Sequence, residues 1–278
     1  MKVIYAVADL RSALATHKGE QIGFVPTMGA LHAGHLSLVE RARKECGVVV
    51  VSIFVNPTQF NDKGDLAAYP RTLPADLELL SPIGPDYVFA PSVEEVYPTP
   101  DTREFDFGMV DKVMEGASRP GHFNGVGQVV SKLFDFVEPH KAYFGEKDFQ
   151  QIAVIKELVR QMGSPVEIVE CPIVRDTDGL ALSSRNTLLD EAHRAAAPHI
   201  YATLRKAVER KAEFASPAEM VAWVEEEINK NPLLKCIYFE VVDALSMQSV
   251  AEWTNDCNTQ GCIAVQCGSV RLIDNIKV

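Results

Sequence analysis

IGFVPTMGALHAGHLSL, residues 22–38, is the stretch of sequence that decides the fold. Its first residues, Ile22 to Val25, form a short apolar run that predicts a buried strand. Pro26 is expected to end this strand, because proline has no N–H group to donate to a ladder. A loop over residues 27–31 then leads through His32-Ala33-Gly34-His35 into a helix predicted over residues 36–45. Strand, glycine-bearing loop and helix start together predict a unit of an α/β fold.

The predicted helix start carries two histidines beside backbone N–H groups that have no acceptor within the helix. Such N–H groups, at the positive end of the helix dipole, attract anions. The rings of His32 and His35 add N–H donors, whether neutral or protonated. The pattern indicates a phosphate site. The alternative is a helix start with two surface histidines, and the strand before the histidines and the helix after them favour the site.

A second apolar run, VVVVSIFV at residues 48–55, follows the helix. Its β-branched residues predict a strand buried on both faces of a parallel sheet. Strand, helix and strand form a βαβ unit with a right-handed crossover. Asn56 and Gln59 come directly after the second strand, where an open α/β sheet has its ligand crevice. An ordinary Asn-Pro turn is the alternative at this place.

The rest of the chain alternates between strand and helix patterns and then changes character near residue 176. Before that point we expect strands over residues 3–6, 87–90, 105–107, 141–144 and 166–169, and helices over 8–17, 73–80, 126–137 and about 145–162. After it we expect helices over 190–210 and 217–230 and strands over 236–243 and 263–276. These patterns predict a Rossmann-like doubly wound parallel sheet in residues 1–175 and a smaller α+β domain in residues 176–278.

Two further loops carry side chains suited to an anionic ligand. Arg119 lies in a glycine-rich loop before a predicted helix, and Lys147 lies at a helix start after the strand 141–144. Asp148 is a candidate cap for the helix that follows. Gln150 and Gln151 point to different sides of that helix, so we expect at most one of them to face a ligand.

A third polar segment combines two hydroxyls with a guanidinium. Ser183, Ser184 and Arg185 are adjacent, and this combination suits phosphate oxygens. The Asp-Thr-Asp-Gly sequence at residues 176–179 predicts a turn before them. It lacks the spacing and the final glutamate of an EF-hand calcium loop.

Composition narrows the classes of function. The 278-residue chain has a formal net charge of −11, which argues against a general nucleic-acid binder but allows a locally basic site. The N-terminal residues do not resemble a signal peptide, and no apolar run is long enough for a membrane span. Six scattered cysteines form no CxxC pair, and reduced thiols in a cytoplasmic protein are expected. Residues 254–268, with Cys257, Cys262 and Cys267, match no pattern that we interpret.

Five strings of residues occur in order between Pro26 and Asn186: PTMGALHAGH, FVNPTQF, RPGHFNGV, FGEKDFQQ and RDTDGLALSSRN. Together they resemble the pantothenate synthetase (pantoate–β-alanine ligase) family, within the wider group of HxGH nucleotidyltransferases. In that group a mobile KMSKS-like loop occupies the place of Ser183 to Asn186. The resemblance implies ATP-dependent condensation of (R)-pantoate with β-alanine through pantoyl adenylate, giving pantothenate, AMP and pyrophosphate.

The resemblance also assigns roles to residues. It implies that His35 acts as the acid toward the leaving group, and that Gln59 and Gln151 hold pantoate, with Asn56 and Arg119 as further substrate residues. The residues implied in catalysis are His32, His35, Lys147, Ser183, Ser184 and Arg185. The residues implied in ATP binding are Met28, Gly29, Ala30, Leu31, His32, Ala33, Gly34, His35, Gly145, Glu146, Lys147, Asp148, Val174, Leu182, Ser183, Ser184 and Arg185.

The resemblance further implies Mg²⁺ with ATP, although the sequence names no ligand for it, and a cytoplasmic homodimer acting on small molecules rather than on nucleic acid or membrane. Two alternatives stay open at this point. Another HxGH enzyme, such as a phosphopantetheine adenylyltransferase, would keep AMP in its product, and it would leave FVNPTQF and FGEKDFQQ unexplained. A non-catalytic nucleotide-binding module would bind ATP without turnover.

Overall fold

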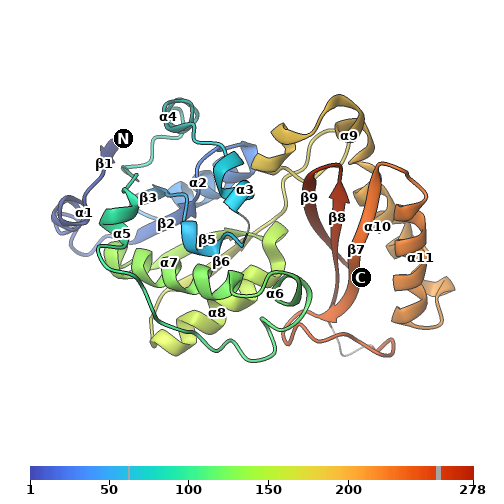
Figure 1. The fold of residues 1–278 in the computed structure, drawn as a ribbon. Coiled ribbons are helices and arrows are strands. Elements are labelled where there is room, and N and C mark those ends of the chain that lie inside the picture. The colour runs from blue at the N-terminus through green and yellow to red at the C-terminus, as the bar shows by residue number, and fades with distance from the viewer. Residues whose placement is uncertain (62, 255–257) are drawn as a thin grey trace. The chain divides into compact units, whose positions relative to one another are not determined.

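A computed structural model describes residues 1–61, 63–254 and 258–278 of the protein. The chain divides into two compact units, whose elements are labelled in Figure 1. The first unit consists of Met1–Phe107, Arg119–Glu146 and Val154–Pro172, and the second of Gly108–Ser118, Lys147–Ala153 and Ile173–Val278. The domain boundary expected at residue 175 stays a prediction, because two short segments before it pack with the second unit.

The first unit is built on a parallel sheet with the strand order β1-β4-β3-β2-β5-β6. From the neighbours β2 and β5 the chain runs outward through β3 and β4 on one side and to β6 on the other, with β1 at the edge beyond β4, so β2 and β5 mark the switch point of a doubly wound sheet. This confirms the predicted Rossmann-like fold class. The strands are β1 (Lys2–Ile4), β2 (Ile22–Thr27), β3 (Val48–Ile53), β4 (Tyr87–Phe89), β5 (Lys141–Gly145) and β6 (Glu167–Cys171).

Helices cover both faces of this sheet because its strands are apolar on both sides. On one face α2 packs with Val39 and Ala42 against Val25 and Val49 of the central strands. On the other face α7 places Phe134 edge-to-face with Phe24. The helical segments that begin in this unit are α1 (Val7–Leu14), α2 (Ala33–Glu45), η1 (Pro57–Gln59), α3 (Lys63–Ala68), α4 (Leu73–Leu80), α5 (Val93–Val96), α7 (His122–Val137) and η2 (Glu146–Asp148).

The second unit contains an antiparallel sheet in the order β7-β8-β9, with helices packed on it. Arg175 makes a bidentate ion pair with Asp274, at 2.6 and 2.9 Å, and its guanidinium lies 3.5 Å from the ring centre of Tyr201. The elements are α6 (Met114–Ser118), α8 (Phe149–Met162, whose later turns belong to the first unit), η3 (Ser184–Leu188), α9 (Glu191–Ala196), α10 (His199–Glu209), η4 (Lys211–Glu213), α11 (Pro217–Asn229), β7 (Leu234–Asp243), β8 (Thr259–Cys267) and β9 (Val270–Lys277).

The expectation that Pro26 ends its strand is wrong, since β2 continues to Thr27 and Pro26 pairs with Ser52. The backbone of β2 faces its two neighbours alternately. The carbonyl of Thr27 accepts from Phe54 on the β3 side, whereas that of Ile22 accepts from His140 on the β5 side. Pro26 therefore faces β5, where the ladder covers only Gly23 and Phe24. The missing N–H thus removes no ladder hydrogen bond.

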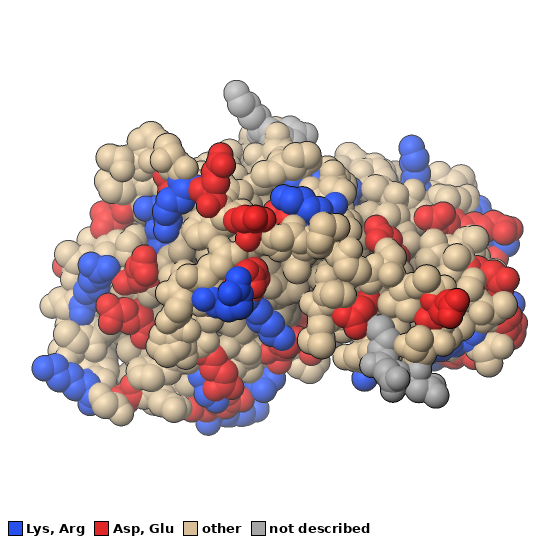
Figure 2. Space-filling view, turned by 90° about the horizontal axis from the view of Figure 1, so that it is seen from below, with Lys and Arg blue, Asp and Glu red and all other residues tan. Residues whose placement is uncertain are grey.

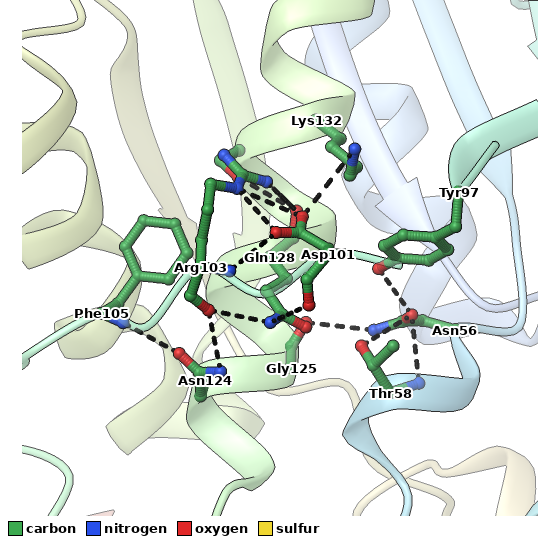
Figure 3. A network of polar contacts seen from close by, with 11 residues as sticks. Asn56, Thr58, Tyr97, Asp101, Arg103, Phe105, Asn124, Gly125, Gln128 and Lys132 are labelled. Carbon is green, nitrogen blue, oxygen red and sulfur yellow. Dashed lines mark hydrogen bonds and ion pairs between the residues drawn. The ribbon is translucent and has the colours of Figure 1, made fainter. Parts of the chain in front are cut away.

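The strand expected over residues 105–107 is also absent, because side chains of α7 bind the backbone of residues 101–105 (Figure 3). Phe105 donates its N–H to Asn124 Oδ1 at 2.9 Å. Gln128 Nε2 donates to the carbonyls of Arg103 and Asp101, at 2.9 and 3.1 Å. These backbone groups therefore have hydrogen-bond partners on α7 and do not pair with a neighbouring strand.

Most other boundaries differ from the expectations by a few residues, and three elements differ more clearly. The helix expected over residues 190–210 is two helices that meet at Pro198, which has no N–H to continue the first one. The strand expected over 263–276 is the hairpin of β8 and β9, which turns at Gly268 with φ +59°. The helix expected from residue 126 already begins at His122. Within the uninterpreted segment 254–268, residues 259–267 form β8 and Cys257 lies outside the described residues.

One charge cluster joins the C-terminal end of α2 to β5. Glu45 accepts from Arg41 Nε at 2.9 Å, and its second oxygen accepts from Lys141 Nζ and Tyr143 Oη at 3.1 Å. These hydrogen bonds, chiefly that of Arg41, lower the pKa of Glu45 from 4.5 to about 2. The ionised carboxylate therefore stabilises the fold above pH about 4.5, and this stabilisation is lost as the pH falls towards about 2.

We expect Glu45→Gln to lower the melting temperature at pH 7, because the variant loses the charge that Arg41 and Lys141 bind. The difference from the wild type should narrow as the pH falls from about 5 towards about 2, where the wild-type carboxylate also becomes neutral. Thermal unfolding across this range measures it. Glu78→Gln, at an exposed site on α4, is the control and should show no such narrowing. A pH-independent difference for Glu45→Gln would contradict this account.

Candidate functional site

The histidines of the predicted phosphate site lie at the first turn of α2, directly after the loop that follows β2. His32 is the N-cap residue, with extended backbone, and its Nδ1 accepts the N–H of Gly34 at 3.1 Å. The N–H of His32 in turn approaches Nδ1 of His35, at 3.4 Å. The two ring centres are 4.1 Å apart. The two histidines thus cap the helix reciprocally, in the manner of a capping box.

These caps determine which ring nitrogen carries the proton. A backbone N–H can only donate, so Nδ1 of each histidine must be the unprotonated acceptor. The remaining proton of each neutral ring is therefore on Nε2, and His32 and His35 both have an Nε2–H donor. Two such donors beside a helix N-terminus suit an anion that carries several oxygens. The sequence predicted the histidines as donors but could not predict this choice of tautomer.

A buried carboxylate that the sequence analysis did not identify holds the loop before His32. Asp76, 1 % exposed, accepts the N–H of Ala30 at 3.1 Å and the N–H of Leu31 at 2.8 Å. Thr72 Oγ1 is a third donor at 3.2 Å. The loop has positive φ values of 81° at Gly29 and 49° at Ala30. A positive φ is unfavourable for a residue with a Cβ such as Ala30, and the contacts of Asp76 compensate for this cost. No local pattern predicts the contact, since Asp76 is 45 residues from Leu31 in the chain.

The turn after β3 presents Gln59 on the short helix η1. Asn56, before this turn, is 1 % exposed, and its side chain donates to Gln59 Oε1 and to the carbonyl of Gly125, both at 3.1 Å. Figure 3 shows the contact with Gly125. Gly125 lets α7 approach η1 closely, because a Cβ there would lie 2.4 Å from the carbonyl oxygen of Thr58. Gln59 Nε2 lies 3.3 Å from Sδ of Met28, which belongs to the loop after β2. The structure thus brings together residues from two of the predicted loops.

Arg119 lies near the backbone of this same turn. His122 Nδ1 donates to the carbonyl of Gln59 at 2.8 Å, which leaves Nε2 as the acceptor for Arg119 Nη1 at 3.2 Å. Arg119 Nη2 also approaches the carbonyl of Gln59, at 3.5 Å. His122 is buried and was missed by the sequence analysis, although it lies in the quoted string RPGHFNGV. Both side chains therefore contribute to the position of Gln59.

The second unit contains the candidates of the FGEKDFQQ string from Lys147 onward. Lys147 Nζ lies 3.8 Å from Asp148 Oδ1, and Asp148 is the last residue of η2. Gln150 is buried, donating to the carbonyls of Val110 and Val113 and accepting from the N–H of Glu115. Gln151 is partly exposed. Gln150 therefore has a structural role, which leaves Gln151 as the candidate for ligand contact.

The RDTDGLALSSRN string forms a small hairpin followed by a 3₁₀ turn in the second unit. Leu182 donates its N–H to the carbonyl of Val174 at 3.0 Å, which closes the hairpin. Ser183 caps η3 by accepting the N–H of Arg185 at 3.3 Å, and Ser184 is buried. Arg194 pairs with the two aspartates of the turn, Asp176 and Asp178. Ser183, Ser184 and Arg185 thus lie together at the start of η3, directly after the hairpin.

The distribution of charged and apolar side chains indicates no further candidate site among the described residues. On the face that Figure 2 shows, acidic and basic side chains are interspersed. Among the described residues there is no group of three or more His, Cys, Asp or Glu side chains that could hold a metal ion. No helix in the described ranges is both long enough and apolar enough to cross a membrane.

The sheet order and the histidine-capped helix start after its central strand define a Rossmann-like α/β protein. Comparison with known proteins gives the family. The model of the family described as pantoate-beta-alanine ligase matches residues 2–277, so the chain belongs to the pantoate–β-alanine ligase family. A relative from Bacteroides thetaiotaomicron, named pantothenate synthetase, is 58 % identical over 100 % of this chain and 99 % of its own length.

Two solved structures are similar over the whole chain. The crystal structure of pantothenate synthetase from Thermus thermophilus is 44 % identical with a TM-score of 0.93, covering 100 % of this chain and 99 % of the other. The pantoate-beta-alanine ligase from Francisella tularensis is 36 % identical with a TM-score of 0.84, covering 100 % and 97 %. That structure is described as a complex with beta-gamma ATP and beta-alanine.

We expect Asp76→Asn to destabilise the loop before His32, because an amide has one acceptor oxygen where the carboxylate has two. One of the N–H groups of Ala30 and Leu31 then loses its partner, at a cost of about 1–3 kcal/mol. Urea unfolding measures this loss, and faster amide exchange at the two residues would locate it.

Thr72→Val is the matched control, since it removes a donor from the same carboxylate but leaves both backbone contacts. It should cost less than Asp76→Asn and should leave the two amides protected. Equal stability of Asp76→Asn and wild type, with unchanged amide exchange, would show that the loop does not depend on the carboxylate.

Proposed function

We propose that this protein condenses (R)-pantoate with β-alanine at the expense of ATP, giving pantothenate, AMP and pyrophosphate. The observation that carries the proposal is the family match over residues 2–277, which includes every string of the candidate site. The structure supports it with a histidine-capped helix start after β2 and an amide-bearing turn after β3. These are an expected phosphate site and an expected site for a hydroxy acid.

In the first half-reaction the pantoate carboxylate attacks the α-phosphorus of ATP, and the bond from this phosphorus to the bridging oxygen breaks, releasing pyrophosphate. Negative charge increases on the phosphate oxygens and on the leaving group. The Nε2–H donors of His32 and His35 stabilise that charge. His35 fills the acid role toward the leaving group by donating this hydrogen bond, because a neutral imidazole keeps its only N–H proton. Donors fixed in advance at the developing charge lower the barrier most effectively.

In the second half-reaction the amine of β-alanine attacks the acyl carbon of pantoyl adenylate. The bond to the AMP oxygen breaks, the nitrogen loses a proton, and pantothenate and AMP leave. Adenylation is needed because a free carboxylate has no adequate leaving group. The protein's contribution is to position the amine and the acyl carbon next to one another.

The assignment of residues to substrates is part of the proposal. Gln59 and Gln151 bind pantoate, with Asn56 and Arg119 supporting that site, and Lys147, Ser183, Ser184 and Arg185 bind the phosphates with the two histidines. The other proposed ATP contacts come from the loops after β2 and β5 and from the hairpin before η3: Met28, Gly29, Ala30, Leu31, Ala33, Gly34, Gly145, Glu146, Asp148, Val174 and Leu182.

Three further points belong to this proposal. Mg²⁺ enters as part of the MgATP substrate, and we assign no protein ligand to it. The protein acts in the cytoplasm on small molecules, as expected for an enzyme of cofactor-precursor biosynthesis. It is a homodimer, as the family resemblance implies. Light scattering of the purified protein measures its molar mass and tests this last point directly.

The first half-reaction gives the experiment that tests the function, because it is reversible and needs no amine. We expect label from pyrophosphate to return to ATP when the protein is incubated with Mg²⁺, ATP and pantoate, without β-alanine. Adding β-alanine should then release AMP. Exchange that does not require pantoate would contradict the proposal and favour another adenylyltransferase, and the absence of exchange would favour a binding module.

His35→Ala is the control that ties the exchange to this site. We expect it to lose about 10²- to 10³-fold in exchange rate, the usual loss when a donor to a developing charge is removed. Its fold should survive, since the lost helix cap is worth only about 1 kcal/mol. His17→Ala is the control, at a histidine that precedes β2 in the sequence. It should keep the wild-type exchange rate.

The adjacent pair Gln150 and Gln151 allows a matched comparison. We expect Gln151→Ala to raise the pantoate concentration for half-maximal exchange by about tenfold or more, with little effect on ATP and on stability. Gln150→Ala should instead lower the unfolding temperature, because the carbonyls of Val110 and Val113 lose their donor. If Gln151→Ala weakened ATP and pantoate equally, its assignment to pantoate would be wrong.

A further inference from the structure

The amide of Asn56 is buried in a network whose members determine its orientation (Figure 3). Its Nδ2 lies 3.1 Å from the carbonyl oxygen of Gly125, a group that can only accept. Its Oδ1 lies 3.4 Å from the N–H of Thr58, a group that can only donate. If the oxygen and nitrogen of Asn56 were interchanged, its oxygen would face the carbonyl oxygen of Gly125 and its NH₂ group would face the N–H of Thr58. The orientation therefore follows from chemistry and not from the assignment of similar atoms.

The orientation of Asn56 fixes that of Gln59. The second N–H of Asn56 Nδ2 points to the Gln59 side chain at 3.1 Å, so the atom facing it must be the oxygen Oε1. The NH₂ group of Gln59 is then turned the other way, where Nε2 lies 3.3 Å from Sδ of Met28. A thioether is a weak acceptor, so a ligand oxygen would be a stronger partner for these N–H groups. Gln59 thus presents donors, which suit a carboxylate or hydroxyl oxygen.

Tyr97 completes this arrangement from the segment that follows α5. Its hydroxyl donates to Asn56 Oδ1 at 2.9 Å, a shorter contact than those of Thr58 Oγ1 and N at 3.1 and 3.4 Å. The ring is held by Phe54 and by Lys132, whose Nζ lies 5.4 Å from the ring centre. Burial raises the pKa of Tyr97, so the phenol keeps its proton at physiological pH. Tyr97 is thereby linked to the side chain of Gln59 through Asn56.

We propose that Tyr97 is a positioning residue for the pantoate site: through Asn56 it holds the amide of Gln59 with its NH₂ group towards the substrate. The inference rests on the proposed function, since it takes pantoate as the ligand of Gln59. Tyr97 does not touch the substrate. Its hydroxyl affects how the NH₂ group of Gln59 binds an oxygen of pantoate, and does not affect the phosphate chemistry at His32 and His35.

Tyr97→Phe tests the inference, because phenylalanine keeps the ring and its packing but removes the hydroxyl. We expect the pantoate concentration for half-maximal pyrophosphate exchange to rise about three- to tenfold, the equivalent of one hydrogen bond. The maximal exchange rate and the half-maximal ATP concentration should stay within about twofold. Tyr87→Phe is the matched control, since Tyr87 Oη lies 2.8 Å from His17 Nε2, away from this network, and should leave all three values unchanged.

A double-mutant cycle separates positioning from a merely structural role. If Tyr97 acts through the amide of Gln59, Tyr97→Phe should have less than about a twofold effect on pantoate once Gln59→Ala is present. If the hydroxyl only stabilises the fold, its full effect should persist in that background, and the inference is overturned. Thermal unfolding of each variant, which we expect to lie near that of the wild type, shows that the comparison is made between folded proteins.

Asn56→Asp is a second and independent variant, because a carboxylate cannot donate to Gln59 Oε1. The amide of Gln59 then loses the contact that sets its orientation and can turn over. We expect it to weaken pantoate more than Tyr97→Phe does. Unchanged half-maximal pantoate in both variants, with exchange present in the wild type, overturns the inference alone. Absence of pantoate-dependent exchange in the wild type overturns the proposed function instead, so the two failures are distinct.

Discussion

The in-register pairing of β2 with β3 is the constraint on which the arrangement of the first unit depends. Thr27 pairs with Ile53 at the carboxyl ends of the two strands, so the loop to His32 and the turn to Gln59 leave the sheet beside each other. The contact between Met28 and Gln59 follows from this pairing. A slip of one residue would exchange the side chains of β2 between the two helix-covered faces, which would disrupt the packing on both, and would also separate the two loops. Core packing therefore determines the geometry of the candidate site.

Buried polar side chains carry this geometry from the sheet to the loops. Asp76 holds the backbone before His32, and Asn56 holds the side chain of Gln59. Each has the partners that it needs, which is the condition for burying a polar group without a large cost. Such a network favours one arrangement strongly, because any other leaves a donor or acceptor without a partner inside the protein.

The sequence predicted the elements that depend on local pattern and failed where the partner is distant. The βαβ unit around His32 follows from apolar runs and from a helix start, which nearby residues specify. Pro26 was misjudged because its effect depends on which neighbouring strand its nitrogen faces. The strand expected at Phe105 failed because the acceptor for its N–H is a side chain 19 residues away. The contacts of Asp76 and Tyr97 span 45 and 41 residues, and no periodicity encodes them.

Gly125 shows how a site can limit the variation of a residue that has no part in its chemistry. A Cβ at this position would lie 2.4 Å from the carbonyl oxygen of Thr58 and 2.8 Å from Cα of Gln59. Both neighbours are backbone atoms, so no rotamer change makes room, and every other amino acid has a Cβ. For protein engineering, position 125 should therefore be kept as glycine. Here the sequence encodes a distance between two backbones and not a chemical group.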